Sequence, residues 1–101
     1  MYLINSRLTA DGAEISANLL QRLLVDIADP DDCLEHLYAE TGSREARLAF
    51  FLRHPDLAAA ESAAAGLCLR ALACCPELEG WSMAYCGAGV VPAAEEILLG
   101  S

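Results

Sequence analysis

Lysine is absent from this chain of 101 residues, so all six of its basic side chains are arginines. β-Branched residues are also scarce, because Val, Ile and Thr together number only nine. Strands favour β-branched residues, whereas alanine and leucine, present in 19 and 17 copies, lose little conformational freedom in a helix. We therefore predict an all-α fold, a compact bundle of about five to six short helices in a single domain over residues 1–101.

Recognised ligand or catalytic motifs are also lacking, although the chain has five cysteines and two histidines. No Cys-x-x-Cys pair occurs, and the adjacent Cys74 and Cys75 suit a shared tetrahedral metal site poorly. Cys33 and His36 have a helical spacing, but most cysteines fall where apolar residues are expected, and buried free cysteine behaves as a small hydrophobe. We expect no metal, no cofactor and no enzymatic activity.

The sequence also shows no recognisable targeting signal. Residues 1–8 are too short and too polar for a signal peptide, and the apolar runs are far shorter than a membrane span. An odd number of cysteines is more typical of free thiols in a reducing compartment than of a disulfide framework. The expected location is the cytoplasm.

Four prolines mark the expected helix starts, because proline and nearby carboxylates suit the first turn of a helix. Asp11 is the expected N-cap of the first helix. The alanine-rich helix that follows Pro55 has a surface of small side chains, which predicts a place near the centre of the bundle. Residues 1–9 are expected to form an extended arm. The expected helices span residues 12–28, 30–41, 44 to 52 or 53, 55–74, 77–86 and 92–99.

One segment resembles a known helical repeat. An Asp-Pro pair and a His-Pro pair lie 25 residues apart, and each precedes an expected helix. Residues 28–55 thereby resemble one unit of a leucine-rich-variant or HEAT-type repeat, with an extra residue near its end. The resemblance implies helix-on-helix packing over about a quarter of the chain. The residues that carry it are Asp29, Pro30, Leu34, Leu37, Arg47, Ala49, His54 and Pro55.

Acidic side chains are concentrated in two stretches that contain no arginine. The remaining six acidic residues balance the six arginines, so the two stretches account for the net charge of −9. Helix starts explain part of this pattern, since carboxylates stabilise a first turn. We interpret the stretches as a binding face. The candidate partner-binding residues are Asp26, Asp29, Asp31, Asp32, Glu35, Glu77, Glu79, Glu95 and Glu96.

An acidic face favours a basic partner and disfavours direct contact with nucleic acid or an anionic membrane. The expected function is a non-catalytic protein-binding module that occupies a basic, nucleic-acid-binding surface of a partner protein or nucleoprotein complex and inhibits it. In length, charge and lack of enzymatic motifs, the chain resembles phage-encoded inhibitors of the anti-CRISPR kind. That resemblance implies stoichiometric action on a bacterial nucleoprotein complex.

Two other classes of function stay open. The first is a helical adaptor or oligomerisation subunit, including a homo-oligomer, whose contact is the small-residue surface of residues 58–72 or the apolar residues 97–99. In that case the acidic residues serve solubility alone. The second is a small cytosolic enzyme or a thiol or metal protein whose cysteines and histidines meet only in the tertiary structure. The sequence also leaves open whether the two acidic stretches share one face.

Overall fold

The computed structural model describes residues 2–12 and 14–87, which form an α/β fold. A four-stranded antiparallel sheet packs with two α-helices, so our prediction of an all-α bundle is wrong. The elements in chain order are β1 (Tyr2–Ala10), α1 (Ala17–Ile27), the 3-10 turn η1 (Pro30–Asp32), β2 (Leu34–Thr41), β3 (Glu45–Leu52), α2 (Leu57–Cys74), the 3-10 turn η2 (Pro76–Leu78) and β4 (Trp81–Gly87).

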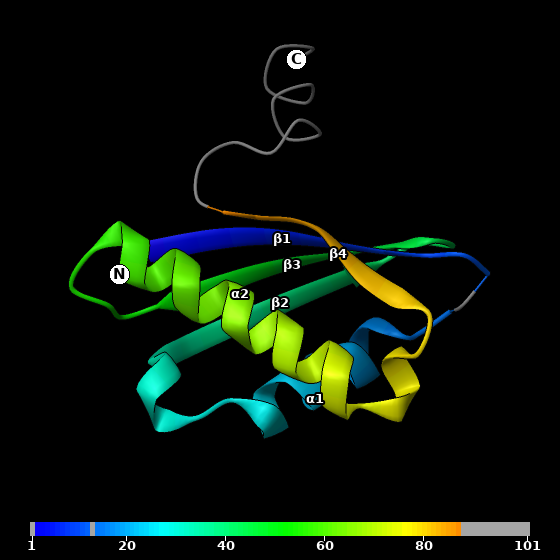
Figure 1. The fold of residues 1–101 in the computed structure, drawn as a ribbon, viewed down its shortest axis with the longest axis horizontal. Helices are drawn as coiled ribbons and strands as arrows, with labels where there is room; N and C mark the ends of the chain where they lie inside the picture. The colour runs from blue at the N-terminus through cyan, green and yellow to red at the C-terminus, as the bar shows by residue number, and fades with distance from the viewer. Residues whose placement is uncertain (1, 13, 88–101) are drawn as a thin grey trace, which may run out of the picture.

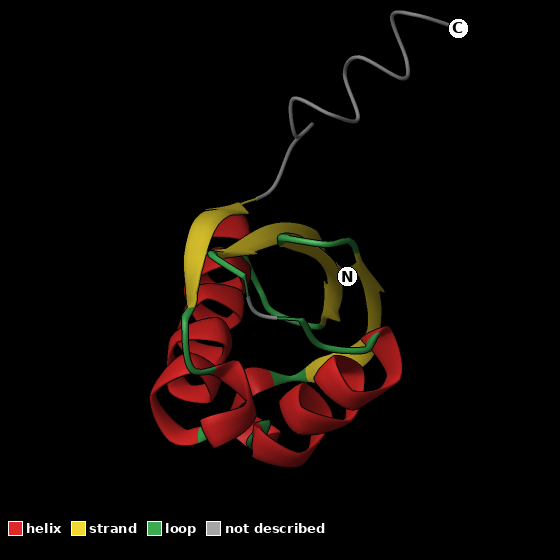
Figure 2. Ribbon diagram, turned by 90° about the vertical axis from the view of Figure 1, so that its right-hand side faces the viewer, coloured by secondary structure: helices red, strands yellow, loops and turns green. Residues whose placement is uncertain are grey.

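The strands are ordered β2-β3-β1-β4 across the sheet (Figure 1). This order, with the chain sequence βαββαβ, is the split-βαβ arrangement of ferredoxin-like domains. Both α-helices lie on the same side of the curved sheet (Figure 2). No described helix lies on the opposite side, which we call the open face.

Strand β3 shows most clearly why the helix prediction over residues 44 to 52 or 53 is wrong. Its even-numbered residues, from Ala46 to Leu52, are all buried toward the helices. Apolar residues two positions apart follow the period of a strand, whereas a helix face needs spacings of three and four. The same alternation buries Ile4 and Leu8 of β1.

The helix expected over residues 30–41 is also absent. Proline and two acidic residues start a single turn, η1, which ends at Cys33. Cys33 has a left-handed backbone with φ of 54°, a conformation that does not continue a right-handed helix. The chain then extends as β2, which pairs along β3.

The helix expected over residues 77–86 is replaced by η2 and β4. Gly80 separates the two elements with φ of 89°, a conformation that glycine adopts at little cost. Trp81 is 7% exposed and lies in the core, but it reaches the core from a strand and not from a helix.

The two helices in the structure were both expected, with different limits. Helix α1 begins after Ser16, whose Oγ accepts the Leu19 N–H at 3.1 Å, so Asp11 is not its N-cap. Helix α2 begins after Asp56, whose carboxylate accepts the Ala59 N–H at 2.8 Å. The segment expected as an arm is β1, a central strand. The helix expected over residues 92–99 lies outside the described residues.

The core lies between the sheet and the two helices. Ala60 and Ala64 of α2 are fully buried, and their small side chains let this helix approach the sheet closely. The largest fully buried side chains are Phe50, Ile4, Leu8, Leu20, Leu24, Leu52, Leu67, Leu78 and Cys68.

Candidate interaction surface

Three aromatic rings meet on the open face of the sheet. His36 and Tyr38 of β2 contact edge-to-face, with 4.4 Å between their ring centroids. Phe51 of β3 lies 6.1 Å from each of them. Leu3 of β1 is opposite Phe51 in the strand register and is 45% exposed. We call Leu3, His36, Tyr38 and Phe51 the aromatic patch.

Strand geometry places these four residues together. Successive side chains of a strand point to opposite faces, so the burial of Leu37 directs His36 and Tyr38 outward. The register pairs His36 with Phe51 across β2 and β3. Tyr38 is 59% exposed, the largest value among the exposed large apolar residues that the structure describes.

Charged residues occupy the other end of the open face, and their charges cancel. Arg7 of β1 is opposite Arg47 of β3, and Arg47 is opposite Glu40 of β2. Arg47 Nε donates a hydrogen bond to Glu45 Oε1 at 2.8 Å. This bond lowers the pKa of the Glu45 carboxyl below its usual value and raises the pKa of Arg47.

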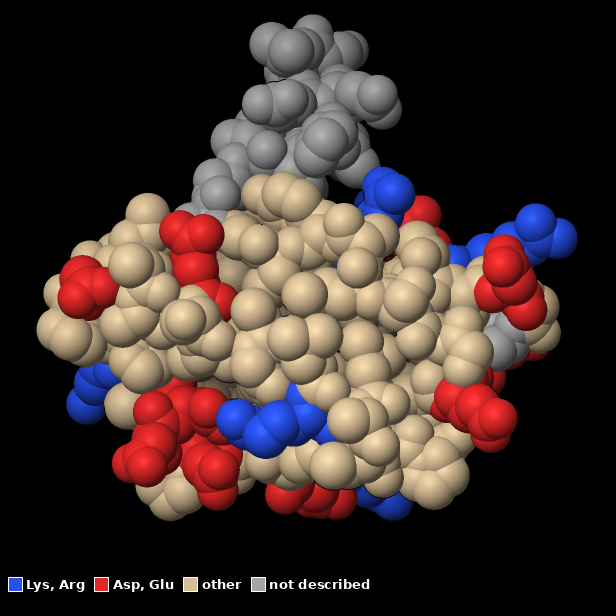
Figure 3. All heavy atoms as spheres, viewed as in Figure 1, with Lys and Arg blue, Asp and Glu red and all other residues tan. Residues whose placement is uncertain are grey.

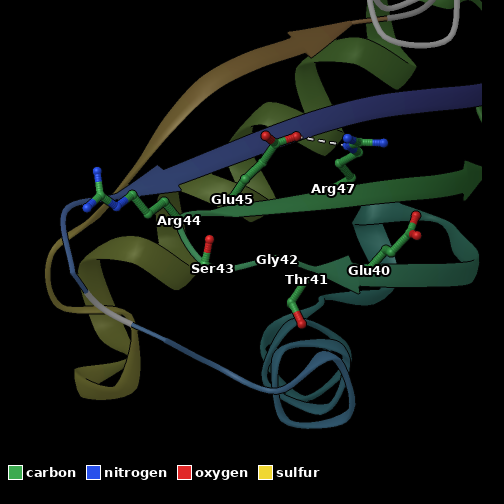
Figure 4. Close-up of a pocket in the computed structure, with 7 residues that line it drawn as sticks. All are labelled: Glu40, Thr41, Gly42, Ser43, Arg44, Glu45 and Arg47. Atoms are coloured by element: carbon green, nitrogen blue, oxygen red, sulfur yellow. Dashed lines mark hydrogen bonds and ion pairs between the residues drawn. The ribbon is translucent and has the colours of Figure 1, made fainter.

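A hollow of about 380 Å³ lies at the turn between β2 and β3 (Figure 4). Neither histidine nor cysteine lines it, and its only hydroxyl groups are those of Thr41 and Ser43. The charged groups of the lining are the carboxylates of Glu40 and Glu45 and the guanidinium groups of Arg44 and Arg47. The lining residues are Glu40, Thr41, Gly42, Ser43, Arg44, Glu45 and Arg47.

Among the candidate acidic residues, Asp32 is held inside the domain. It is 7% exposed, and its Oδ2 accepts the Asp29 N–H at 2.8 Å and Arg70 Nη2 at 2.5 Å. Its backbone carbonyl accepts a hydrogen bond from His54 Nε2 at 2.8 Å. The carboxylate of Asp32 therefore ties η1 to α2 and is not available on the surface.

The other candidate acidic residues differ in their surroundings. Glu35 pairs with Arg53, with 3.0 Å between Oε1 and Nε. Asp26, Asp29, Asp31, Glu77 and Glu79 are exposed, whereas Glu95 and Glu96 lie outside the described residues.

The turns η1 and η2, which include or adjoin Asp29, Asp31, Glu77 and Glu79, both pack against α2 on the helix side of the sheet. Acidic groups lie in separate clusters around the edge of the molecule in Figure 3, with arginines beside some of them.

Helix α2 has the length and composition of a membrane-crossing helix, with a mean hydropathy of 1.4. Core helices of soluble proteins meet the same criteria, and Ala60, Ala64 and Leu67 here pack into the core. Its outer side remains apolar, because Leu57 and Leu69 are 41% and 53% exposed.

Cysteine and histidine residues form no metal centre in the described part of the chain, where no group of three or more potential ligands occurs. All five cysteines are free thiols. Cys68 and Cys86, from α2 and β4, do come together.

The geometry defines an α/β domain with an open sheet face that carries an aromatic patch. Comparisons with protein-family models, with curated proteins and with solved structures found no match.

None of the residues of the aromatic patch was among the partner-binding candidates from the sequence. The available signal was the alternation in residues 45–52, which places Arg47, Ala49 and Phe51 on one face of a strand.

Proposed function

We propose that this protein is a non-catalytic interaction module that pairs with a second copy of itself through the open face. The aromatic patch carries this proposal. Exposed apolar clusters on folded domains commonly mark contact sites, and tyrosine and arginine are among the residues that contribute most to protein interfaces. Tyr38 of β2 and Leu3 of β1 are 59% and 45% exposed, on either side of β3.

The size of the open face suits a stable pair. Four strands spaced about 4.8 Å apart, with about 3.3 Å per residue, cover roughly 500 Å² in projection over eight residues. Projecting side chains make the accessible surface larger than this projection. A standard interface buries about 800 Å² of accessible surface per partner, so the face is of the required order.

Charge favours a second copy over nucleic acid as the occupant. Arg7 and Arg47 on the open face are balanced by Glu40 and Glu45. A nucleic-acid site needs an excess of positive charge to neutralise phosphates. The exposed acidic residues of η1 and η2 lie on the helix side, where two copies of a chain with charge −9 would repel each other. The open face avoids that repulsion.

Sedimentation velocity over a range of protein concentrations tests the proposal. We expect reversible dimers of the wild-type protein, and monomers after Leu3→Glu combined with Tyr38→Glu. The matched control is Val25→Glu combined with Leu69→Glu, which adds the same charge at helix positions that are 51% and 53% exposed. This control should still form dimers.

Three results would argue against pairing through the open face. The wild-type protein could stay monomeric at every concentration. The helix-side control could dissociate instead, which would place the contact on the outer side of the helices α1 and α2. Alternatively, a single-stranded oligonucleotide could bind the wild type and lose affinity in the Leu3→Glu, Tyr38→Glu variant, which would make the face a nucleic-acid site.

A second candidate function follows from the exposed carboxylates of Asp26, Asp29 and Asp31 at the end of α1 and in η1. These residues could contact a basic surface of a partner and block nucleic-acid binding there. Since Asp32 and Glu35 already pair with arginines, the contact would rest on fewer residues than the sequence indicated.

A further inference from the structure

Two thiols and a hydroxyl converge between the sheet and α2. Ser6 of β1 and Cys86 of β4 are directly opposite in the strand register. Directly opposite residues point to the same face of a sheet, and Ser6 is buried beneath α2. The Ser6 Oγ lies 3.4 Å from the Sγ of Cys68, and it also donates to the Tyr85 carbonyl at 3.0 Å.

Both cysteines adjoin Ser6, because Cys86 is its cross-strand partner in β4 and the Cys68 Sγ contacts its hydroxyl from α2. They differ in accessibility: Cys68 is fully buried, whereas Cys86 is half-buried in the edge strand. An oxidant from solvent therefore reaches Cys86 first.

Their ionisation differs in the same sense. The hydrogen bond from the Cys68 thiol lowers the pKa of Cys86, and Ser6 acts in the same direction, although burial and Glu61 oppose it. The pKa of Cys68 is raised by its bond with Cys86 and by burial. Cys86 is thus the thiolate-forming member of the pair, and thiolates are the nucleophiles in thiol oxidation.

We propose that Cys86 and Cys68 are a reversible redox pair, which peroxide oxidises to a disulfide between β4 and α2. The Cys86 thiolate attacks one oxygen of hydrogen peroxide and the O–O bond breaks, which gives Cys86 sulfenic acid and hydroxide. The hydroxide takes up the proton that the Cys86 thiol released and becomes the first water. The Cys68 sulfur then attacks the sulfenic sulfur, loses its proton and releases a second water. Two thiols and one peroxide thereby become one disulfide and two waters.

Reduction restores the pair. Two equivalents of a low-molecular-weight thiol such as glutathione exchange with the disulfide, giving back both protein thiols and one small-molecule disulfide. The adjacent Cys74 and Cys75 are poor competitors, since neighbouring Cα atoms are about 3.8 Å apart and disulfides need about 4.4–6.8 Å.

Peptide mapping identifies the bond directly. The full-length protein is oxidised with hydrogen peroxide, its free thiols are blocked with N-ethylmaleimide, and it is cut with trypsin and Glu-C. These proteases separate the relevant cysteines, with Cys68 on residues 62–70, Cys74 and Cys75 on residues 71–77, and Cys86 on residues 80–95.

We expect residues 62–70 to be linked to residues 80–95, with loss of about 2 Da from the intact mass and full reversal by glutathione. The closed loop should also raise the melting temperature on the order of 10 °C.

Variants separate the two chemical steps. Cys68→Ser and Cys68→Ala should stop at the Cys86 sulfenic acid, which dimedone traps. The control, Cys74→Ser with Cys75→Ser, should form the same disulfide at the wild-type rate. Linkage of residues 62–70 to residues 71–77 would overturn the proposal, as would overoxidation of Cys86 while Cys68 remains open to alkylation after unfolding.

Discussion

At the scale of single residues, Cys33 has a backbone conformation that is unfavourable for a residue with a Cβ atom. Among the residues that the structure describes, it is the only non-glycine residue with positive φ. The left-handed conformation costs an L-residue about 1–2 kcal/mol, because Cβ crowds the following carbonyl oxygen. The backbone is held there because the Cys33 carbonyl accepts the Arg53 N–H at 2.9 Å.

We predict that Cys33→Gly raises the free energy of unfolding by about 0.5–1 kcal/mol. Glycine removes the crowding, and its greater freedom in the unfolded chain offsets part of the gain. Urea unfolding followed by circular dichroism measures the change. Cys33→Ala is the control, because alanine keeps Cβ and should give no gain. Equal stabilisation by both substitutions would show that the thiol, and not the backbone, is responsible.

The sequence shows the acidic residues and the arginines but does not indicate which of them form ion pairs. Arg70 pairs with Asp32, which lies 38 positions earlier in the chain. Arg53, directly after β3, pairs with Glu35 of the neighbouring strand β2. The first acidic stretch contains no arginine in the sequence itself. Arg53 and Arg70 come next to that stretch only in the folded protein, where the end of β3 and α2 pack beside it.

At the scale of elements, η1 depends on one buried carboxylate. Asp32 Oδ2 accepts both the Asp29 N–H within the turn and Arg70 of α2. Loss of a carboxylate that bonds a charged partner leaves the partner and a backbone N–H unsatisfied. Arg70 is 39% exposed, so water compensates part of this loss and the cost is below that of a fully buried pair.

We therefore predict that Asp32→Ala lowers the free energy of unfolding by about 2 kcal/mol. Asp31→Ala in the same turn is the matched control, because Asp31 is exposed and its loss should cost no more than about 0.5 kcal/mol. Chemical denaturation of both variants provides the comparison. Similar values for the two substitutions would mean that Asp32 acts only as a first-turn acid and not as a tie to α2.

The elements that the sequence predicted correctly are those with local signals. Helices α1 and α2 have N-caps and long apolar faces that depend on residues close in the chain. Strands β2 and β3 have no such signal beyond alternation, and their abundant alanine and leucine favour helix. Their stability comes from pairing with β1 and with each other, which local propensity does not contain.

At the scale of the whole molecule, the aromatic patch and the exposed acidic residues beside α2 lie on opposite sides of the sheet. The open face is neutral and carries the aromatic patch, whereas the exposed acidic residues of η1 and η2 surround the helix side. The two candidate functions therefore use different sides of the domain. A copy on the open face leaves the acidic residues free, so pairing and contact with a basic partner are compatible.

Two double variants of equal net charge distinguish a local acidic contact from an effect of total charge. Asp26→Lys with Asp31→Lys changes two acids to bases and moves the net charge from −9 to −5, and Asp11→Lys with Glu14→Lys does the same elsewhere. All four side chains are exposed, so both variants should fold. If η1 and the end of α1 form the contact, an arginine-rich peptide should bind the Asp26→Lys, Asp31→Lys variant several-fold more weakly than the other double variant.

Fluorescence anisotropy of the labelled peptide at increasing salt measures this difference. The wild-type affinity should fall steeply as salt increases, because exposed charges are screened within about 10 Å at 0.1 M ionic strength. The first variant should show a shallower fall, since two of the contacts are already lost. Equal affinities and equal salt dependence for both variants would mean that the peptide senses only the total charge. In that case the acidic residues serve solubility, and the open face remains the proposed contact surface.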